Sequence, residues 1–464
     1  MDKPIGNSNV ARDIASQIHP HTNLRAFEKE GAMVMARGEG VWVYDDLGNR
    51  YLEGMSGLWS VALGFGNERL IEAANRQFRK LAYYQNFAHK STDPAIELAE
   101  RLLKIAPVPM ARVLFQSSGS EANDTAVKIC WYYWNGLGKP ERRKIIGRIK
   151  GYHGTGIASA SITGLPNLHK EWNLPLPGFL HTDCPHYYRF GGAGESEEAF
   201  ATRCAENLEK LIIAEGPDTI AAFFAEPVMG TGGVIVPPAT YFEKIQQVLR
   251  KYGVLLVVDE VITGFGRTGA MWGCQKYDLR PDLLTCAKAL SSSYLPISAL
   301  LISDRIYEAM KDQTDDIGVL GHGYTYGGHP VCAAVALEAL NIYEELGIAE
   351  HAARIGDHMQ TRLRHELSGH PLVGEVRGVG MMAAIELVKD KASKQPFDPS
   401  LKVAPYFAKA AQDNGLMTRA LGDAVALAPP LIAEIEHIDF AIDVCEKSLK
   451  ATQDWLNREG HSIS

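Results

Sequence analysis

The stretch VLLVVDE, residues 254–260, joins five consecutive apolar residues directly to two carboxylates. A run of aliphatic residues without a polar position predicts a strand buried on both faces, as in a parallel sheet covered by helices. The amphipathic segment 241–252 precedes this run. A helix followed by a fully apolar strand is the repeating unit of an α/β sheet, and Asp259 stands where the strand should end.

Similar apolar runs recur on both sides of this stretch. They are VLF at 113–115, IIGRI at 145–149, AAFFA at 221–225, LLTCA at 283–287 and ISALLIS at 297–303. Helix-period segments such as 198–214 lie between them. This alternation predicts an α/β fold with a large domain, whose mostly parallel sheet is covered by helices on both faces.

The two ends of the chain have a different pattern. Short strand-like runs near 32–52 form a meander, and the last third is mainly helical, with segments near 331–346, 350–367, 401–414 and 434–456. We therefore expect an N-terminal segment, 1–70, whose strands pack with the small domain; a large domain, 71–335; and a smaller α+β domain, 336–464.

Composition excludes several classes of protein. With 464 residues, 46% hydrophobic and 22% charged, the chain is globular, and its net charge of −8 without a basic block disfavours nucleic-acid binding. The apolar runs fall far short of the ~20 residues of a spanning helix, and the N-terminus lacks signal-peptide features, so we expect a cytoplasmic protein without a membrane role. The seven cysteines and 15 histidines have no disulfide-framework or metal-ligand spacing, so no metal is expected.

Small and polar residues follow five of the predicted strands. They are QSSGSEAN at 116–123, KGYHG at 150–154, Glu226-Pro227, Asp259-Glu260 and Lys288. Ligands of open α/β sheets bind outside the carboxyl ends of the strands. These segments are therefore expected to form one site.

The turn containing Ser118, Gly119 and Ser120 comes before a helix-period segment. Small residues allow a phosphate to approach the free N–H groups at a helix N-terminus, and serine hydroxyls add donors. When the turn is taken alone, an ordinary serine-capped helix is the commoner explanation. Lys288 similarly either reaches solvent or is buried as a neutral, nucleophilic amine, and a lone Asp259 fits a helix cap or an ion pair.

Taken together, these residues match the needs of pyridoxal phosphate. The turn would hold the phosphate, Asp259 would keep the pyridinium nitrogen protonated, and Lys288 would form the Schiff base and carry the proton between carbon atoms. Tyr152 would cover the ring face.

GFGRTG at 264–269 matches the dinucleotide-binding pattern G-x-G-x-x-G. Five residues separate it from the preceding strand, and the residues after it are a poor helix start, so its context argues against nicotinamide or flavin binding. The sequence also contains no Gly-x-Ser-x-Gly, P-loop or His-Glu-x-x-His motif.

The ordered motifs SGSEAND at 118–124, DEVITGFGRTG at 259–269, PDL at 281–283 and Lys288 resemble class III pyridoxal-phosphate aminotransferases. The resemblance runs from about Trp42 to Ile432 and is closest to the omega-transaminase branch, the amine:pyruvate and beta-alanine:pyruvate type. It implies fold type I and a homodimer with the active site at the subunit interface, with a tetramer left open.

The resemblance also implies roles for individual residues. Lys288 corresponds to the Schiff-base lysine and Asp259 to the pyridinium partner. The other cofactor positions are Gly119 and Ser120 at the phosphate, Tyr152 and Val261 on the two ring faces, the active-site glutamate Glu226, and Thr325, which would reach the phosphate from the partner subunit.

The resemblance also implies substrate contacts at Tyr152 and at three further positions. Trp59 and Phe87 would shape the pocket, and Arg419 would pair with a substrate carboxylate, for which a guanidinium is well suited. An ordinary core tryptophan and a surface arginine are the alternatives for Trp59 and Arg419.

The expected activity is transfer of an amino group from a primary amine or omega-amino acid to pyruvate or a similar keto acid, through the Lys288 Schiff base and pyridoxamine phosphate. An aminomutase, racemase or decarboxylase of the same fold is the nearest alternative. A nicotinamide-dependent oxidoreductase or a non-enzymatic binding protein is more distant.

Overall fold

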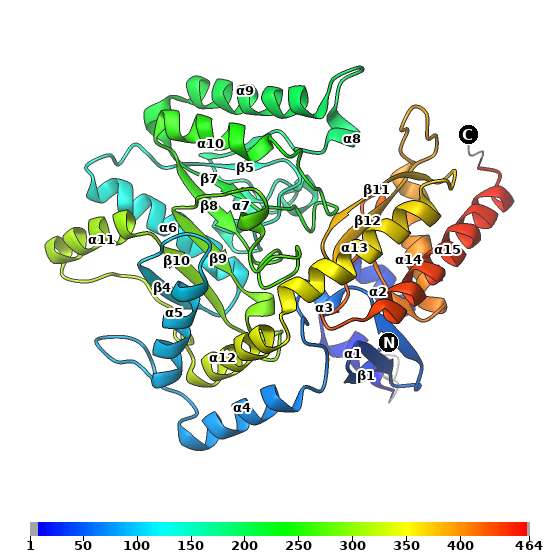
Figure 1. The fold of residues 1–464 in the computed structure, drawn as a ribbon, viewed down its shortest axis with the longest axis horizontal. Helices are drawn as coiled ribbons and strands as arrows, with labels where there is room; N and C mark the ends of the chain where they lie inside the picture. Colours follow the sequence, from blue (N-terminus) through cyan, green and yellow to red (C-terminus); the bar gives the residue numbers. More distant parts are fainter. Residues whose placement is uncertain (1–7, 462–464) are drawn as a thin grey trace, which may run out of the picture.

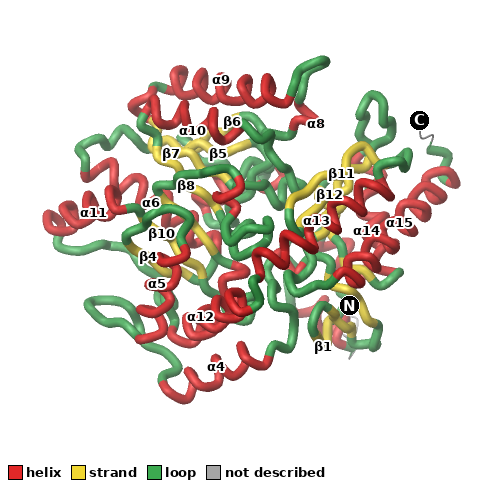
Figure 2. Tube along the Cα trace, in the orientation of Figure 1, coloured by secondary structure: helices red, strands yellow, loops and turns green. Residues whose placement is uncertain are grey.

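The computed structural model describes residues 8–461. Figure 1 shows a larger lobe, which contains most of the cyan and green elements, and a smaller lobe near which both termini lie. Strands lie inside the larger lobe with helices on both sides (Figure 2). This layered arrangement is the α/β fold that the sequence predicts.

The larger lobe is built on one seven-stranded sheet with the order β4-β10-β9-β8-β7-β5-β6. Its strands are β4 (Arg112–Gln116), β5 (Lys144–Arg148), β6 (Phe179–Thr182), β7 (Ile220–Ala225), β8 (Leu255–Asp259), β9 (Leu283–Cys286) and β10 (Ser298–Ile302). The strands from β9 to β6 pair in parallel, whereas β10 is antiparallel to both β9 and β4. The expected mostly parallel sheet is therefore confirmed.

Helices bury both faces of this sheet, which is why its central strands are apolar throughout. Phe224 packs into one hydrophobic cluster with α6 and α11, and its neighbour Phe223 packs into the other with α9, α10 and α12. Adjacent strand residues point to opposite faces, so both must be apolar. The helices of this lobe are α4 (Glu68–Lys80), α5 (Asp93–Ile105), α6 (Gly119–Gly136), α7 (Ile157–Ile162), α8 (Tyr187–Phe190), α9 (Glu197–Glu215), α10 (Tyr241–Tyr252), α11 (Asp304–Ile317) and α12 (Pro330–Glu345).

The smaller lobe contains two four-stranded sheets. One has the order β11-β12-β15-β14 and the other the order β1-β2-β3-β13. Their strands are β1 (Met35–Glu39), β2 (Trp42–Asp45), β3 (Arg50–Glu53), β11 (Val373–Val379), β12 (Met382–Leu387), β13 (Leu416–Met417), β14 (Arg419–Leu421) and β15 (Ala424–Leu427). Leu416 pairs in parallel with Leu52, so strands from the two ends of the chain share one sheet.

The remaining helices are α1 (Asn9–Ser16), α2 (Leu24–Glu30), α3 (Ser56–Trp59), α13 (Ile348–Leu367), α14 (Val403–Asp413) and α15 (Ile435–Arg458). Sequence periodicity missed β6 and β11. It also merged β13 and β14 into one strand at 415–419, although these two segments belong to different sheets. A short strand has too few residues for its alternating pattern to be recognised. Its existence and its ends depend instead on the strand with which it pairs.

The GFGRTG segment forms a buried junction between the lobes. Arg267 Nη1 donates to the carbonyl oxygens of Met381 (2.9 Å) and Pro429 (2.6 Å), and its Nη2 donates to Ser56 Oγ (3.0 Å). Burial lowers the pKa of Arg267 to about 10. This stretch therefore connects the two lobes, which agrees with the argument against a dinucleotide-binding site.

Candidate active site

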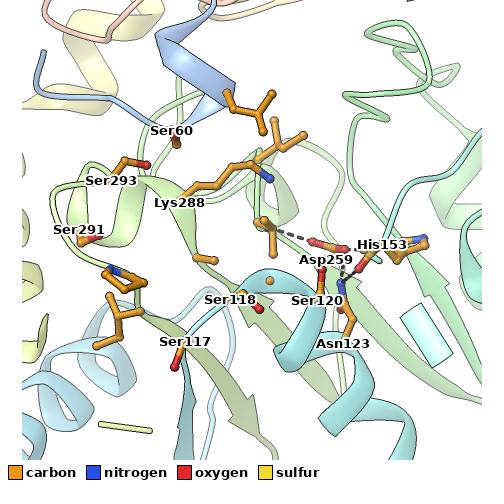
Figure 3. A pocket seen from close by; sticks show the side chains of 18 of the residues that line it. Ser60, Ser117, Ser118, Ser120, Asn123, His153, Asp259, Lys288, Ser291 and Ser293 are labelled. Atoms are coloured by element: carbon orange, nitrogen blue, oxygen red, sulfur yellow. Dashed lines mark hydrogen bonds and ion pairs between the residues drawn. The ribbon is translucent and has the colours of Figure 1, made fainter. Parts of the chain in front are cut away.

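A cavity of about 460 Å³ lies at the carboxyl ends of the parallel strands (Figure 3). It is lined by eight of the cofactor residues predicted from the sequence: Ser118, Gly119, Ser120, Tyr152, Glu226, Asp259, Val261 and Lys288. These residues follow β4, β5, β7, β8 and β9. The fold thus brings together strand-end residues from positions 118 to 288, as the edge of a parallel sheet allows.

Lys288 stands two residues after β9 and extends into this cavity (Figure 3). Its backbone is left-handed, with φ of 47°, a conformation that is strained for a residue with a Cβ. Burial lowers the pKa of its amine, while the charges of Asp259 and Glu226 act in the opposite direction. The lowered pKa favours the neutral amine, which is the nucleophilic form.

The start of α6 forms an anion cradle beside Lys288. Ser118 is the N-cap, and its Oγ accepts a hydrogen bond from Glu121 N (3.2 Å). The first N–H groups of a helix have no partner within it, and the helix dipole favours negative charge there. A Cβ on Gly119 would come within 2.9 Å of Val261 Cγ1, so glycine permits the close approach of these two segments.

Asp259 is buried at the end of β8 and is held by three donors. Its Oδ2 lies 2.7 Å from Asn123 Nδ2 and 2.8 Å from His153 Nδ1, and its Oδ1 accepts from Val261 N (3.0 Å). Figure 3 shows Asn123 and His153 converging on this carboxylate. Neither residue was singled out from the sequence; their presence in two strand-end segments was the only available signal.

Glu226 is buried below Tyr152. Its Oε1 accepts from Tyr152 N (3.0 Å) and its Oε2 from Gly230 N (3.0 Å). Burial raises the pKa of this carboxyl group. Glu226 therefore fixes the backbone that carries Tyr152 at the cavity wall.

A second cavity, of about 420 Å³, adjoins the first, because Lys288, Tyr152 and Leu58 line both. Trp59 and Arg419 line the second cavity. Burial lowers the pKa of Arg419, and the nearby Tyr152 opposes this shift. The neighbouring cavities thus combine an amine, a guanidinium and two aromatic side chains within one small-molecule-sized space.

Phe87 and Thr325 line neither of these two cavities in a single chain. Phe87 is 44% exposed, and a Cβ on Gly323 would meet its ring at 2.8 Å. Thr325 is also exposed, and its carbonyl oxygen accepts from Tyr83 Oη (2.7 Å). Within one chain these two residues therefore lie outside the group formed by the other predicted site residues.

Within residues 8–461, no cluster of His, Cys, Asp and Glu side chains is suited to hold a metal ion. Over the same residues, no helix is both long and apolar enough to cross a membrane.

The chain matches the family described as aminotransferase class-III over residues 26–449. It is 54% identical to an omega transaminase from Pseudomonas jessenii solved in complex with PMP, with a TM-score of 0.96 and coverage of 97% of this chain and 99% of that one. It is 48% identical to gamma aminobutyrate transaminase 3, chloroplastic, from Solanum lycopersicum, over 91% of this chain and 81% of that protein. A probable gamma-aminobutyrate transaminase 3, mitochondrial, from Oryza sativa subsp. indica is 49% identical, over 91% of this chain and 83% of that protein.

Proposed function

Because the chain belongs to the class-III aminotransferases, we propose that it binds pyridoxal 5'-phosphate in the 460 Å³ cavity and transfers an amino group from a primary amine or omega-amino acid to pyruvate or a similar keto acid. The observation that carries this proposal is that Lys288 and the buried Asp259 line one cavity beside the N-terminus of α6. An amine, a carboxylate and an anion cradle are the three groups that this cofactor requires.

The residues present fit the cofactor. The N–H groups of Gly119 and Ser120 and the hydroxyls of Ser118 and Ser120 would hold its phosphate at the helix N-terminus. Tyr152 and Val261 would flank its ring, and Asp259 would bind the ring nitrogen. When bound, the cofactor supplies an aldehyde that condenses with amines and a ring that delocalises an electron pair.

Lys288 would act twice. Its neutral amine would hold the cofactor covalently, and after displacement by the amine substrate the freed amine would accept and return the substrate proton. The lowered pKa of Lys288 supports this second role, because an amine must be unprotonated to accept a proton. The Asp259 carboxylate would hold the ring nitrogen in its protonated form.

The second cavity would hold the rest of the substrate. Arg419 would pair with the carboxylate of pyruvate or of an omega-amino acid, and Trp59 would limit the size of the donor. The names of the relatives support this range, since gamma-aminobutyrate is an omega-amino acid. Phe87 would contribute to a pocket only across a subunit interface, because it lines neither cavity of its own chain.

We further propose a homodimer in which Thr325 reaches the phosphate of the partner subunit's site. The support is that Thr325, Phe87, Tyr83 and Tyr326 are all exposed, and that Tyr83 contacts both Thr325 and Tyr326. Large exposed aromatic side chains are typical of protein interfaces.

The cytoplasmic location stays a prediction, since the two curated relatives above are named as chloroplastic and mitochondrial proteins.

The visible absorption spectrum tests the activity. The cofactor-loaded protein should show a band that bleaches on adding a primary amine and returns on adding pyruvate. A racemase, aminomutase or decarboxylase would retain or recover the band without pyruvate, and each would be identified by its product. Absence of any band after adding pyridoxal phosphate would refute the proposed function.

A further inference from the structure

The Asp259 carboxylate belongs to a hydrogen-bond network that extends beyond the cavity wall. Thr285, on β9, is the residue paired with Asp259 of β8 in the parallel register. Asn123 comes from α6, and His153 follows β5. All four residues are buried, so the hydrogen bonds among them are shielded from water.

Two oxygen acceptors determine how the Asn123 amide is oriented. Asn123 Nδ2 donates to the carbonyl oxygen of His153 (2.7 Å) and to Asp259 Oδ2 (2.7 Å). A flipped amide would place its own oxygen against these two oxygens, so only one orientation satisfies the network. In that orientation Thr285 Oγ1 donates to Asn123 Oδ1 (3.0 Å) and so holds the amide in place.

His153 has one partnered and one unpartnered ring nitrogen. Nδ1 lies 2.8 Å from Asp259 Oδ2, and the backbone N–H of His153 donates to Thr163 Oγ1 (2.9 Å). Nε2 is buried without a hydrogen-bond partner among residues 8–461. The geometry therefore favours a proton on Nδ1, where it donates to Asp259 Oδ2.

The network leaves Asp259 asymmetric. Oδ2 accepts from both Asn123 and His153, whereas Oδ1 accepts from only the backbone N–H of Val261. A carboxylate oxygen has two lone pairs, so Oδ1 can accept one more hydrogen bond. The three contacts thereby hold Asp259 in one orientation.

We propose that Thr285, Asn123 and His153 are positioning residues that hold Asp259 directed at the ring nitrogen of pyridoxal phosphate. This inference rests on the proposed function, because it requires the cofactor to bind beside Asp259. His153 would act only through Asp259, by its Nδ1–H, and Thr285 only through Asn123. A side chain of similar size at position 153 that lacks this N–H would then not be sufficient to position Asp259.

The test compares the affinity of the apoprotein for pyridoxal phosphate, and the absorption band of the complex, among four variants and the wild type. His153→Leu removes the N–H donor. His153→Asn keeps an N–H donor, because the amide nitrogen of Asn is bonded to Cγ, as Nδ1 of His is. Thr285→Val keeps the side-chain shape and removes the hydroxyl. His181→Leu is the matched control, because the His181 ring contacts the carbonyl oxygens of Ile162 and Thr163 and does not hydrogen-bond to Asp259.

We expect His153→Leu to weaken cofactor binding about tenfold to 100-fold, since a hydrogen bond to a charged group is lost. His153→Asn should restore most of the affinity, Thr285→Val should cause a smaller loss, and His181→Leu should match the wild type. If His153→Leu does not fold, His153→Asn and Thr285→Val still decide the outcome.

Equal affinity in wild type and His153→Leu, or equal losses in His153→Leu and His153→Asn, would overturn the proposed donor role. Wild-type affinity in Thr285→Val would remove Thr285 from the network. These results differ from a failure of the proposed function, in which the wild type itself would bind no cofactor.

Discussion

Replacing Glu53 by Gln tests how a buried carboxylate, next to the segment that carries Trp59, affects the stability of the folded protein. Glu53 ends β3, and its Oε1 accepts from Met55 N (2.9 Å) just before α3. Burial raises the pKa of Glu53 from 4.5 to about 7. Because the folded-state pKa lies above the unfolded-state value, the folded protein binds more protons between these pH values, and its stability falls as pH rises from about 4.5 to about 7.

This shift corresponds to about 3 kcal/mol of destabilisation once both states are ionised. Gln carries no charge and should recover that free energy at high pH. At about 2.1 cal/mol/K per residue, the unfolding entropy of 464 residues is about 1 kcal/mol per degree, so Tm should rise by about 3 °C at pH 8.5. At pH 5 the gain should fall to about 1 °C, because most wild-type molecules then carry a protonated Glu53.

Calorimetry or thermal circular dichroism at the two pH values measures these differences. Glu28→Gln is a matched control, because Glu28 is exposed on α2 and should give no change at either pH. A Glu53→Gln gain that is equal at pH 5 and pH 8.5, or a loss of stability at pH 8.5, would refute the reasoning.

Three further substitutions test the proposed chemistry. Lys288→Ala should bind no cofactor covalently and show no amino-group transfer; turnover near the wild-type rate would remove its assigned role. Asp259→Asn, measured with cofactor bound at saturating pyridoxal phosphate, should lower kcat by about 100-fold or more, and unchanged kinetics would mean that another group charges the ring nitrogen. Arg419→Ala should raise KM for pyruvate about tenfold to 100-fold while leaving KM for a simple aldehyde nearly unchanged; equal effects on both would contradict carboxylate binding.

Much of the fold could be predicted because its signals are local. The apolar run at 254–258 and the helix-period segment at 241–252 became β8 and α10 with small changes in their ends. β11 escaped prediction and β13 was not separated from β14, because a strand of this kind is defined by its partner: β13 has only two residues and exists through its pairing with β3. Such pairing depends on contacts between distant parts of the chain.

Strand-end residues such as Lys288 and Asp259 could be assigned to one site from the sequence alone, because parallel strands place their carboxyl ends at one edge of the sheet. Only the tertiary structure decided which side chains hold Asp259, since Asn123 lies 136 residues away and reaches it through the packing of α6. It also decided that Phe87 and Thr325 stand apart from the two cavities of their own chain. Periodicity and turn chemistry are short-range properties of the sequence, whereas hydrogen-bond partners and cavity walls depend on the register between elements.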